Sequence, residues 1–200
     1  MSSEESIIKT QEALRTRGMD AVIVNTQAEA LSKIKELIPS GASVNNGSSR
    51  TLEQIGYIDY LKTKTHGWNN LHAGIIEEQD EVKKVKLRNE ALFSDYYLGS
   101  AHAIAETGEI VVASASGSQL PHLVFTSPNL ILVVGAQKIV SNYEDAMKRV
   151  REFVVPLEDA RMKEVGMGGT ILSKILTIEH EPKFMGRTVT VILVKEPLGF

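Results

Sequence analysis

The chain contains no cysteine. Disulfides, thiolate zinc sites, a cysteine nucleophile and a self-held iron–sulfur cluster are therefore excluded. The chain also lacks a Lys/Arg-rich block, and its net charge is −3. A nucleic-acid-binding protein usually shows a basic domain or stripe, so no nucleic-acid partner is expected. No apolar run approaches the ~20 residues that a membrane helix needs, and no membrane association is predicted.

Several well-known motifs are missing as well. The sequence has neither of the nucleotide loops GxGxxG and GxxxxGK[ST], and no GxSxG nucleophile elbow. Its five histidines show no HxH or HExxH spacing, so no metal site is predicted. The first residues are polar and acidic, unlike a secretory or mitochondrial leader, and a cytoplasmic location is expected. Nothing in these patterns assigns a cofactor.

The remaining composition is that of one globular domain. The chain has 200 residues, of which 42% are hydrophobic and 24% charged. We find no repeat, low-complexity tract or linker. The sequence therefore predicts a single domain over residues 1–200, with a segment beyond Pro156 as the part that could protrude.

Short unbroken apolar runs alternate with amphipathic segments, which is typical of βαβ units. Runs of this kind fit strands that are covered on both faces. We expect an α/β fold with an open, mainly parallel, Rossmann-like sheet and helices on both faces. The expected sheet strands are 21–24, 42–45, 96–99 and 130–134, with a further strand at 188–194.

Other segments have their own patterns. Residues 62–75 are expected to form a loop, and 77–93 a charged helix with Val82, Val85 and Leu92 facing inward. Residues 96–115 are expected to form two or three short strands joined by tight turns. Residues 143–154 are predicted to form an amphipathic helix.

The first candidate site is a polar turn between a strand and a helix. It comprises Asn46, Gly47, Ser48, Ser49, Arg50 and Thr51. Thr51-x-x-Gln54 matches a capping box, which would leave the 47–50 amides free to bind a phosphate or carboxylate. A polar turn without any ligand explains the same residues equally well.

The second candidate is the turn Glu106-Thr107-Gly108, preceded by His102. A carboxylate there could serve as a base or nucleophile if burial raises its pKa. A hairpin turn with a solvated Glu106 is the simpler interpretation of these residues. A single histidine is more often structural than catalytic.

The third candidate comprises Gln119, in a segment of small residues, and Lys138, just after the strand 130–134. The carboxyl ends of parallel strands are where ligands bind, so Lys138 is well placed to meet an anion. The alternative is an ordinary surface lysine.

These segments resemble the LUD (lactate utilisation) domain family. The similarity is carried by AIAETGEIV at 103–111, GSQLP at 117–121 and PNLILVVGAQKIV at 128–140, and extends from SSRTLEQIG at 48–56 to the VKEPLGF end. The resemblance implies the fold of ribose-5-phosphate isomerase, glucosamine-6-phosphate deaminase and CoA transferases. It also implies a setting in bacterial lactate oxidation, beside iron–sulfur partner proteins.

The resemblance suggests roles for the candidate residues. Glu106-Thr107-Gly108 is similar to the Glu-Asn-Gly turn that carries the nucleophile of CoA transferases. The turn 46–51 resembles a phosphate loop of sugar-phosphate enzymes, and Lys138 matches a lysine late in their sheet. Many longer lactate-system members have an acidic residue where this chain has Ala101-His102.

Three functions therefore remain open from the sequence. The leading one is binding or conversion of a small anionic metabolite of organic-acid metabolism, with residues 46–51, Glu106–Gly108 and Lys138 converging on one cleft. The second is a non-catalytic scaffold or regulatory subunit that docks an iron–sulfur partner. A CoA transferase or sugar-phosphate isomerase is the third, and a homo-oligomer is compatible with all of them.

Overall fold

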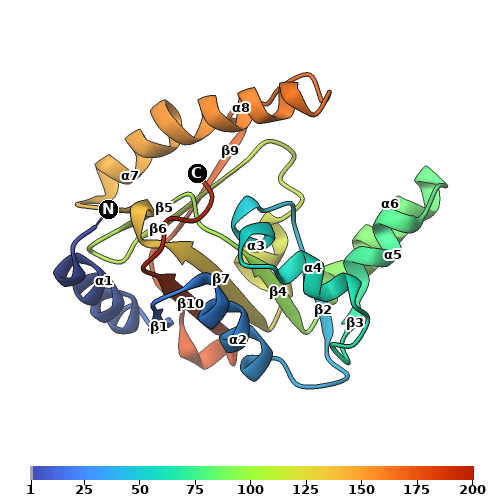
Figure 1. Ribbon diagram of the computed structural model, residues 1–200, viewed down its shortest axis with the longest axis horizontal. Helices are drawn as coiled ribbons and strands as arrows, with labels where there is room; N and C mark the ends of the chain where they lie inside the picture. Colours follow the sequence, from blue (N-terminus) through green and yellow to red (C-terminus); the bar gives the residue numbers. More distant parts are fainter. Residues whose placement is uncertain (1) are drawn as a thin grey trace.

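The computed structural model describes residues 2–200. Its strands form two sheets, and its helices lie around them (Figure 1). The helices are α1 (Glu4–Thr16), α2 (Gln27–Leu37), α3 (Arg50–Gln54), α4 (Tyr57–Lys62), α5 (Leu71–Glu77), α6 (Glu81–Glu90), α7 (Tyr143–Arg149) and α8 (Val155–Glu164). Short helical turns are η1 (Ala91–Phe93), η2 (His122–Thr126), η3 (Ala136–Lys138), η4 (Val150–Val154) and η5 (Lys183–Met185). The strands are β1 (Asp20–Val24), β2 (Ser43–Asn46), β3 (Asn69–Asn70), β4 (Tyr96–Gly99), β5 (Ala103–Ala105), β6 (Ile110–Ser114), β7 (Asn129–Gly135), β8 (Ile139–Val140), β9 (Lys174–Ile178) and β10 (Thr188–Val194).

The main sheet has six strands in the order β1-β10-β7-β4-β2-β3, and all of its pairings are parallel. It contains the four strands predicted at 21–24, 42–45, 96–99 and 130–134, and the predicted open parallel α/β fold is confirmed. The chain beyond Pro156 returns to this sheet, because β10 is inserted between β1 and β7 and pairs with both.

Burial on both faces explains why the central strands are apolar without alternation. In β7, Leu130, Leu132 and Val134 enter one hydrophobic core, whereas Ile131 and Val133 enter the core on the other face. All five are at most 2% exposed.

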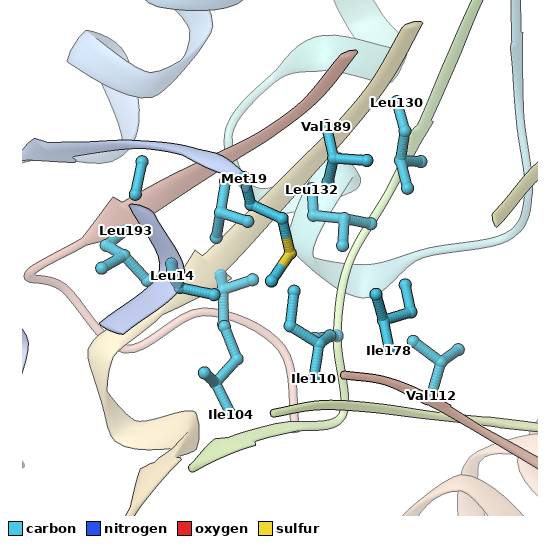
Figure 2. Packing of buried hydrophobic residues seen from close by; sticks show 14 of the residues in the cluster. Leu14, Met19, Ile104, Ile110, Val112, Leu130, Leu132, Ile178, Val189 and Leu193 are labelled. Carbon is cyan, nitrogen blue, oxygen red and sulfur yellow. The ribbon is translucent and has the colours of Figure 1, made fainter. Parts of the chain in front are cut away.

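The two faces are covered differently. One is covered by α2, α3 and α4, whose buried members include Ala30, Ile34, Leu52 and Leu61. The other is covered by α1 and by the second sheet, ordered β8-β5-β6-β9. Figure 2 shows Ile104, Ile110, Val112 and Ile178 of this second sheet packed against residues of the main sheet such as Leu130 and Leu132.

The sequence predicts helices on both faces but gives no sign that the β5–β6 strands form a sheet of their own. Helices α7 and α8 lie on the far side of that second sheet (Figure 1), where Ala146 and Val150 pack with Ala103, Val111 and Ala113. Residues 96–115 do contain three short strands, as predicted.

The region 62–93 differs from the prediction. Part of the expected loop forms β3 and α5, and the helix expected over 77–93 is divided at residues 78–80. Helices α5 and α6 extend away from the body (Figure 1). Val82 is 81% exposed and Val85 51%, so the inward orientation predicted for them is wrong. Helix α6 is stabilised by the Asp80 cap and local ion pairs rather than by packing.

The amphipathic segment 143–154 is helical, with Val150 and Val154 buried. The helix runs on through α8 with a π-helical turn at Val150–Val154. Pro156 explains this turn, since proline has no N–H and its ring pushes the carbonyl of the preceding turn aside. Within residues 2–200, no helix is long and apolar enough to cross a bilayer.

Candidate functional site

A cavity of about 630 Å³ opens at the carboxyl ends of β2 and β4. Its other walls come from the end of β6, from α8 and the loop after it, and from Gly199 and Phe200. Ligands of open α/β sheets bind at this edge. The cavity is therefore the candidate site.

Most of the residues predicted from the sequence line this cavity. They are Gly47, Ser48, Ser49, Arg50, Thr51, His102, Gln119 and Lys138. Asn46 lies just behind them, buried at the end of β2, where its side-chain amide donates to the Gly47 carbonyl over 3.1 Å. Its side-chain oxygen has no hydrogen-bond partner among residues 2–200.

Lys138 is the buried cation of the site, with only 4% of its surface exposed. Its Nζ donates to Thr51 Oγ1 and Ser100 Oγ, each over 3.1 Å, and to the Ala101 carbonyl over 3.2 Å. All three partners are uncharged. Burial, reinforced by the positive charge of Arg149, lowers the pKa of Lys138 to about 7.

The hydroxyls of Thr51 and Ser100, beside Lys138, can each donate a hydrogen bond. Because Nζ donates to both oxygens, each hydroxyl must direct its own hydrogen elsewhere. Thr51 reaches the Leu198 carbonyl only over 3.5 Å, and Ser100 reaches the Ala101 carbonyl over 3.2 Å. These are long hydrogen bonds, so an acceptor atom in the cavity can replace them.

His102 supplies a neutral donor. Its Nδ1 accepts a hydrogen bond from the Ala113 amide over 3.1 Å, which leaves the proton of the neutral ring on Nε2. Burial is the main reason that the pKa of His102 falls to about 4, with smaller effects from Lys138 and Arg149. Arg149 also donates to the His102 carbonyl over 3.1 Å.

The 47–51 turn differs in detail from the prediction. Ser49, not Thr51, caps α3, accepting from the Leu52 amide over 3.3 Å, so the predicted capping box is wrong. Thr51 is instead free to contact Lys138. Gln54 holds the chain end, accepting from the Gly199 amide over 2.6 Å. Since α3 has only five residues, its dipole contributes little.

Glu106 does not reach the cavity. Its carboxylate accepts from Ser6 Oγ over 2.6 Å and pairs with Lys9 Nζ at 2.8 Å, both on α1. These hydrogen bonds lower the pKa of Glu106, the opposite of what a neutral-pH base needs. Strand β5 leaves the cavity after His102 and β6 returns to it at Ser114, so the turn between them lies at the far end of the hairpin.

Thr107 and Gly108 belong to that same turn. The Thr107 carbonyl accepts from Arg17 over 2.7 Å, and Gly108 has φ of 98°, a conformation that favours glycine. The hairpin-turn interpretation therefore fits this segment. The expected convergence holds for the 47–51 turn and Lys138, and not for Glu106–Gly108.

Helix α8 contributes residues that the sequence analysis missed. Glu158, Arg161, Met162 and Val165 line the cavity, at the i, i+3, i+4, i+7 spacing that places them on one helix face. Arg161 pairs with Glu158 through two hydrogen bonds of 2.7 and 2.5 Å. The spacing was visible in the sequence, but nothing there indicated that this face meets the strand ends.

No group of three or more metal-binding side chains forms within residues 2–200.

The LUD domain family model matches residues 7–194. None of the curated proteins gives a significant match. Among solved structures, the chain is similar to a DUF162 family protein from Deinococcus radiodurans, with 14% sequence identity and a TM-score of 0.57. The similarity covers 97% of this chain and 99% of that one, and it concerns the fold alone.

Proposed function

The chain belongs to the LUD-domain family, and on that premise we propose that the cavity around Lys138 binds a small organic anion. The observation that carries the proposal is a buried lysine on the cavity wall whose three partners are all uncharged. Burying a cation without a counter-ion is costly, and an anionic ligand would offset that cost.

The rest of the cavity suits an anion. Thr51 and Ser100 offer hydroxyl hydrogens beside Lys138, and His102 offers Nε2–H. The only Asp or Glu side chain among the residues lining the cavity is Glu158, whose charge is paired with Arg161. A carboxylate ligand would therefore meet donors and little repulsion.

Organic-acid metabolism of the lactate type is the setting that we propose for this ligand. Lys138, with a pKa of about 7, is the residue suited to transfer a proton at neutral pH if the bound acid is converted. The position of Glu106 beside Lys9 gives no support to a CoA-transferase mechanism, which needs that carboxylate at a cleft.

A thermal-shift screen with organic acids, sugar phosphates and CoA esters tests the proposal. We expect organic acids to raise the melting temperature of the wild type and of Thr190→Val, a buried control in β10. Thr51→Val should lose most of that shift. If no anion stabilises the wild type, or if Thr51→Val responds fully, the proposal is wrong.

An exposed apolar surface favours docking of a partner protein as a second function. Phe93, Val124, Phe125, Phe184 and Met185 are between 51% and 87% exposed, at the amino-terminal edge of the main sheet. Exposed apolar patches mark interaction sites. Sedimentation of wild type and Phe125→Ser, alone and with an iron–sulfur protein, tests this function. An unchanged complex with Phe125→Ser would contradict it.

A further inference from the structure

The cavity is larger than a three-carbon acid requires. At roughly 30 Å³ per water-sized group, the six heavy atoms of lactate fill about a third of its 630 Å³. Arg161, Met162 and Val165, on or just after α8, are among the residues that line the cavity. The size and lining of the cavity therefore bear on the class of ligand.

The α8 side of the cavity carries apolar side chains that the fold leaves uncovered. Val165 is 58% exposed and Met167 is 68% exposed, and both line the cavity beside Met162. Ligand pockets are typically lined by apolar side chains together with a few polar groups that orient the ligand. Methionine is unbranched and adapts to irregular apolar groups.

The loop after α8 is built to present these side chains. Gly166, Gly168 and Gly169 have φ of 77°, 75° and 106°, which allows the chain to turn tightly around Met167. The Thr170 amide donates to Asp159 Oδ1 over 2.8 Å and ties the loop back to α8. Met167 is thus held at the cavity by a defined turn.

Lys138, whose hydrogen-bond partners are all uncharged, and the apolar side chains of Met162, Val165 and Met167 line the same cavity. We propose from this that the ligand is an amphipathic organic acid. Its carboxylate lies at Lys138, Thr51 and Ser100, and an alkyl tail of several carbons lies against Met162, Val165 and Met167. This inference rests on the proposed function and adds the class of ligand to it.

The test is calorimetric titration with the series propanoate, butanoate, hexanoate and octanoate at about pH 6.5, where Lys138 is mostly charged. Each buried methylene should raise affinity roughly fourfold until the cavity is filled. In Val165→Asp the affinity should become nearly independent of chain length. The matched control is Val85→Asp, a valine of similar exposure on α6, which should behave as the wild type.

The outcomes separate the two proposals. Binding with no dependence on chain length overturns the amphipathic ligand and leaves the anion site intact. A chain-length dependence that persists in Val165→Asp places the tail elsewhere and also overturns the inference. If hexanol binds as well as hexanoate, the carboxylate contact is wrong, and if no acid binds, the proposed function fails as well.

Discussion

Lys138 and Thr51 are 87 residues apart in the chain, and the Nζ of Lys138 donates to the Thr51 hydroxyl over 3.1 Å. This contact joins η3, which follows β7, to the first turn of α3, across the edge of the main sheet where the cavity opens. The lysine lies there without a carboxylate among its hydrogen-bond partners, so its positive charge destabilises the free protein.

Lys138 should make the stability of the free protein depend on pH. Its pKa is about 7 when folded and near 10.5 when unfolded, so between these values the unfolded chain binds more protons. Stability therefore rises with pH across that window, by up to ~1.4 kcal/mol per pH unit. Urea denaturation at about pH 7 and 9.5 should show this rise in the wild type and a smaller one in Lys138→Met. Equal rises would contradict the burial of a titrating lysine.

His122 should destabilise the protein in acid. It is 3% exposed and stacked on Tyr97, and burial lowers its pKa to about 4 from its usual 6.5. As the pH falls from 6.5 toward 4, the unfolded chain gains a proton that the folded protein does not. His122→Gln should reduce the loss of stability by up to ~1.4 kcal/mol per pH unit over this window. Denaturation curves at three pH values would show it, and an unchanged slope would rule it out.

Glu106 should be dispensable for ligand binding. Its partners are Ser6 and the exposed Lys9 on α1, so Glu106→Gln should cost at most about 1 kcal/mol of stability. The thermal shift produced by a bound organic acid should equal that of the wild type. Loss of ligand binding, or of any acyl-transfer activity, in this variant would restore the CoA-transferase interpretation.

A glycine is required at position 47 because Tyr97 is too close for a side chain. A Cβ on Gly47 would lie 2.8 Å from Tyr97 Oη, and the Tyr97 ring is held by its stack on His122. Gly47→Ala should therefore cost about 1–3 kcal/mol. In a Tyr97→Phe background, which removes that oxygen, the cost should be clearly smaller. An equal cost in both backgrounds would show that the strain lies elsewhere.

The main sheet could be predicted because local pattern and burial agree there. Runs such as 130–134 are apolar at every position, and in the structure both faces of β7 are indeed covered. Lys138 could likewise be placed at a strand end. Its burial could not be predicted, because that depends on Thr51, Ser100 and the chain end, which are brought together only by the fold.

The errors share a physical cause. The direction of the 103–114 hairpin depends on the pairing of β5 with β8 and of β6 with β9, which are distant in sequence, and this pairing turns Glu106 toward α1. In the same way, apolar spacing in 77–93 predicted a packed face, but Val82 and Val85 are 81% and 51% exposed. The sequence of a segment does not by itself determine which other elements the segment packs against.

The most direct test of the anion site is calorimetric titration of the carboxylate that gives the largest thermal shift. Wild type, Lys138→Met and the surface control Lys9→Met would each be titrated at about pH 6 and pH 8.5. Because Lys138 loses its proton near pH 7, the affinity of the wild type and of Lys9→Met should fall at least about tenfold between these values. Lys138→Met should bind weakly and equally at both. If Lys138→Met binds as tightly as the wild type at pH 6, Lys138 does not hold the anion and the account is wrong.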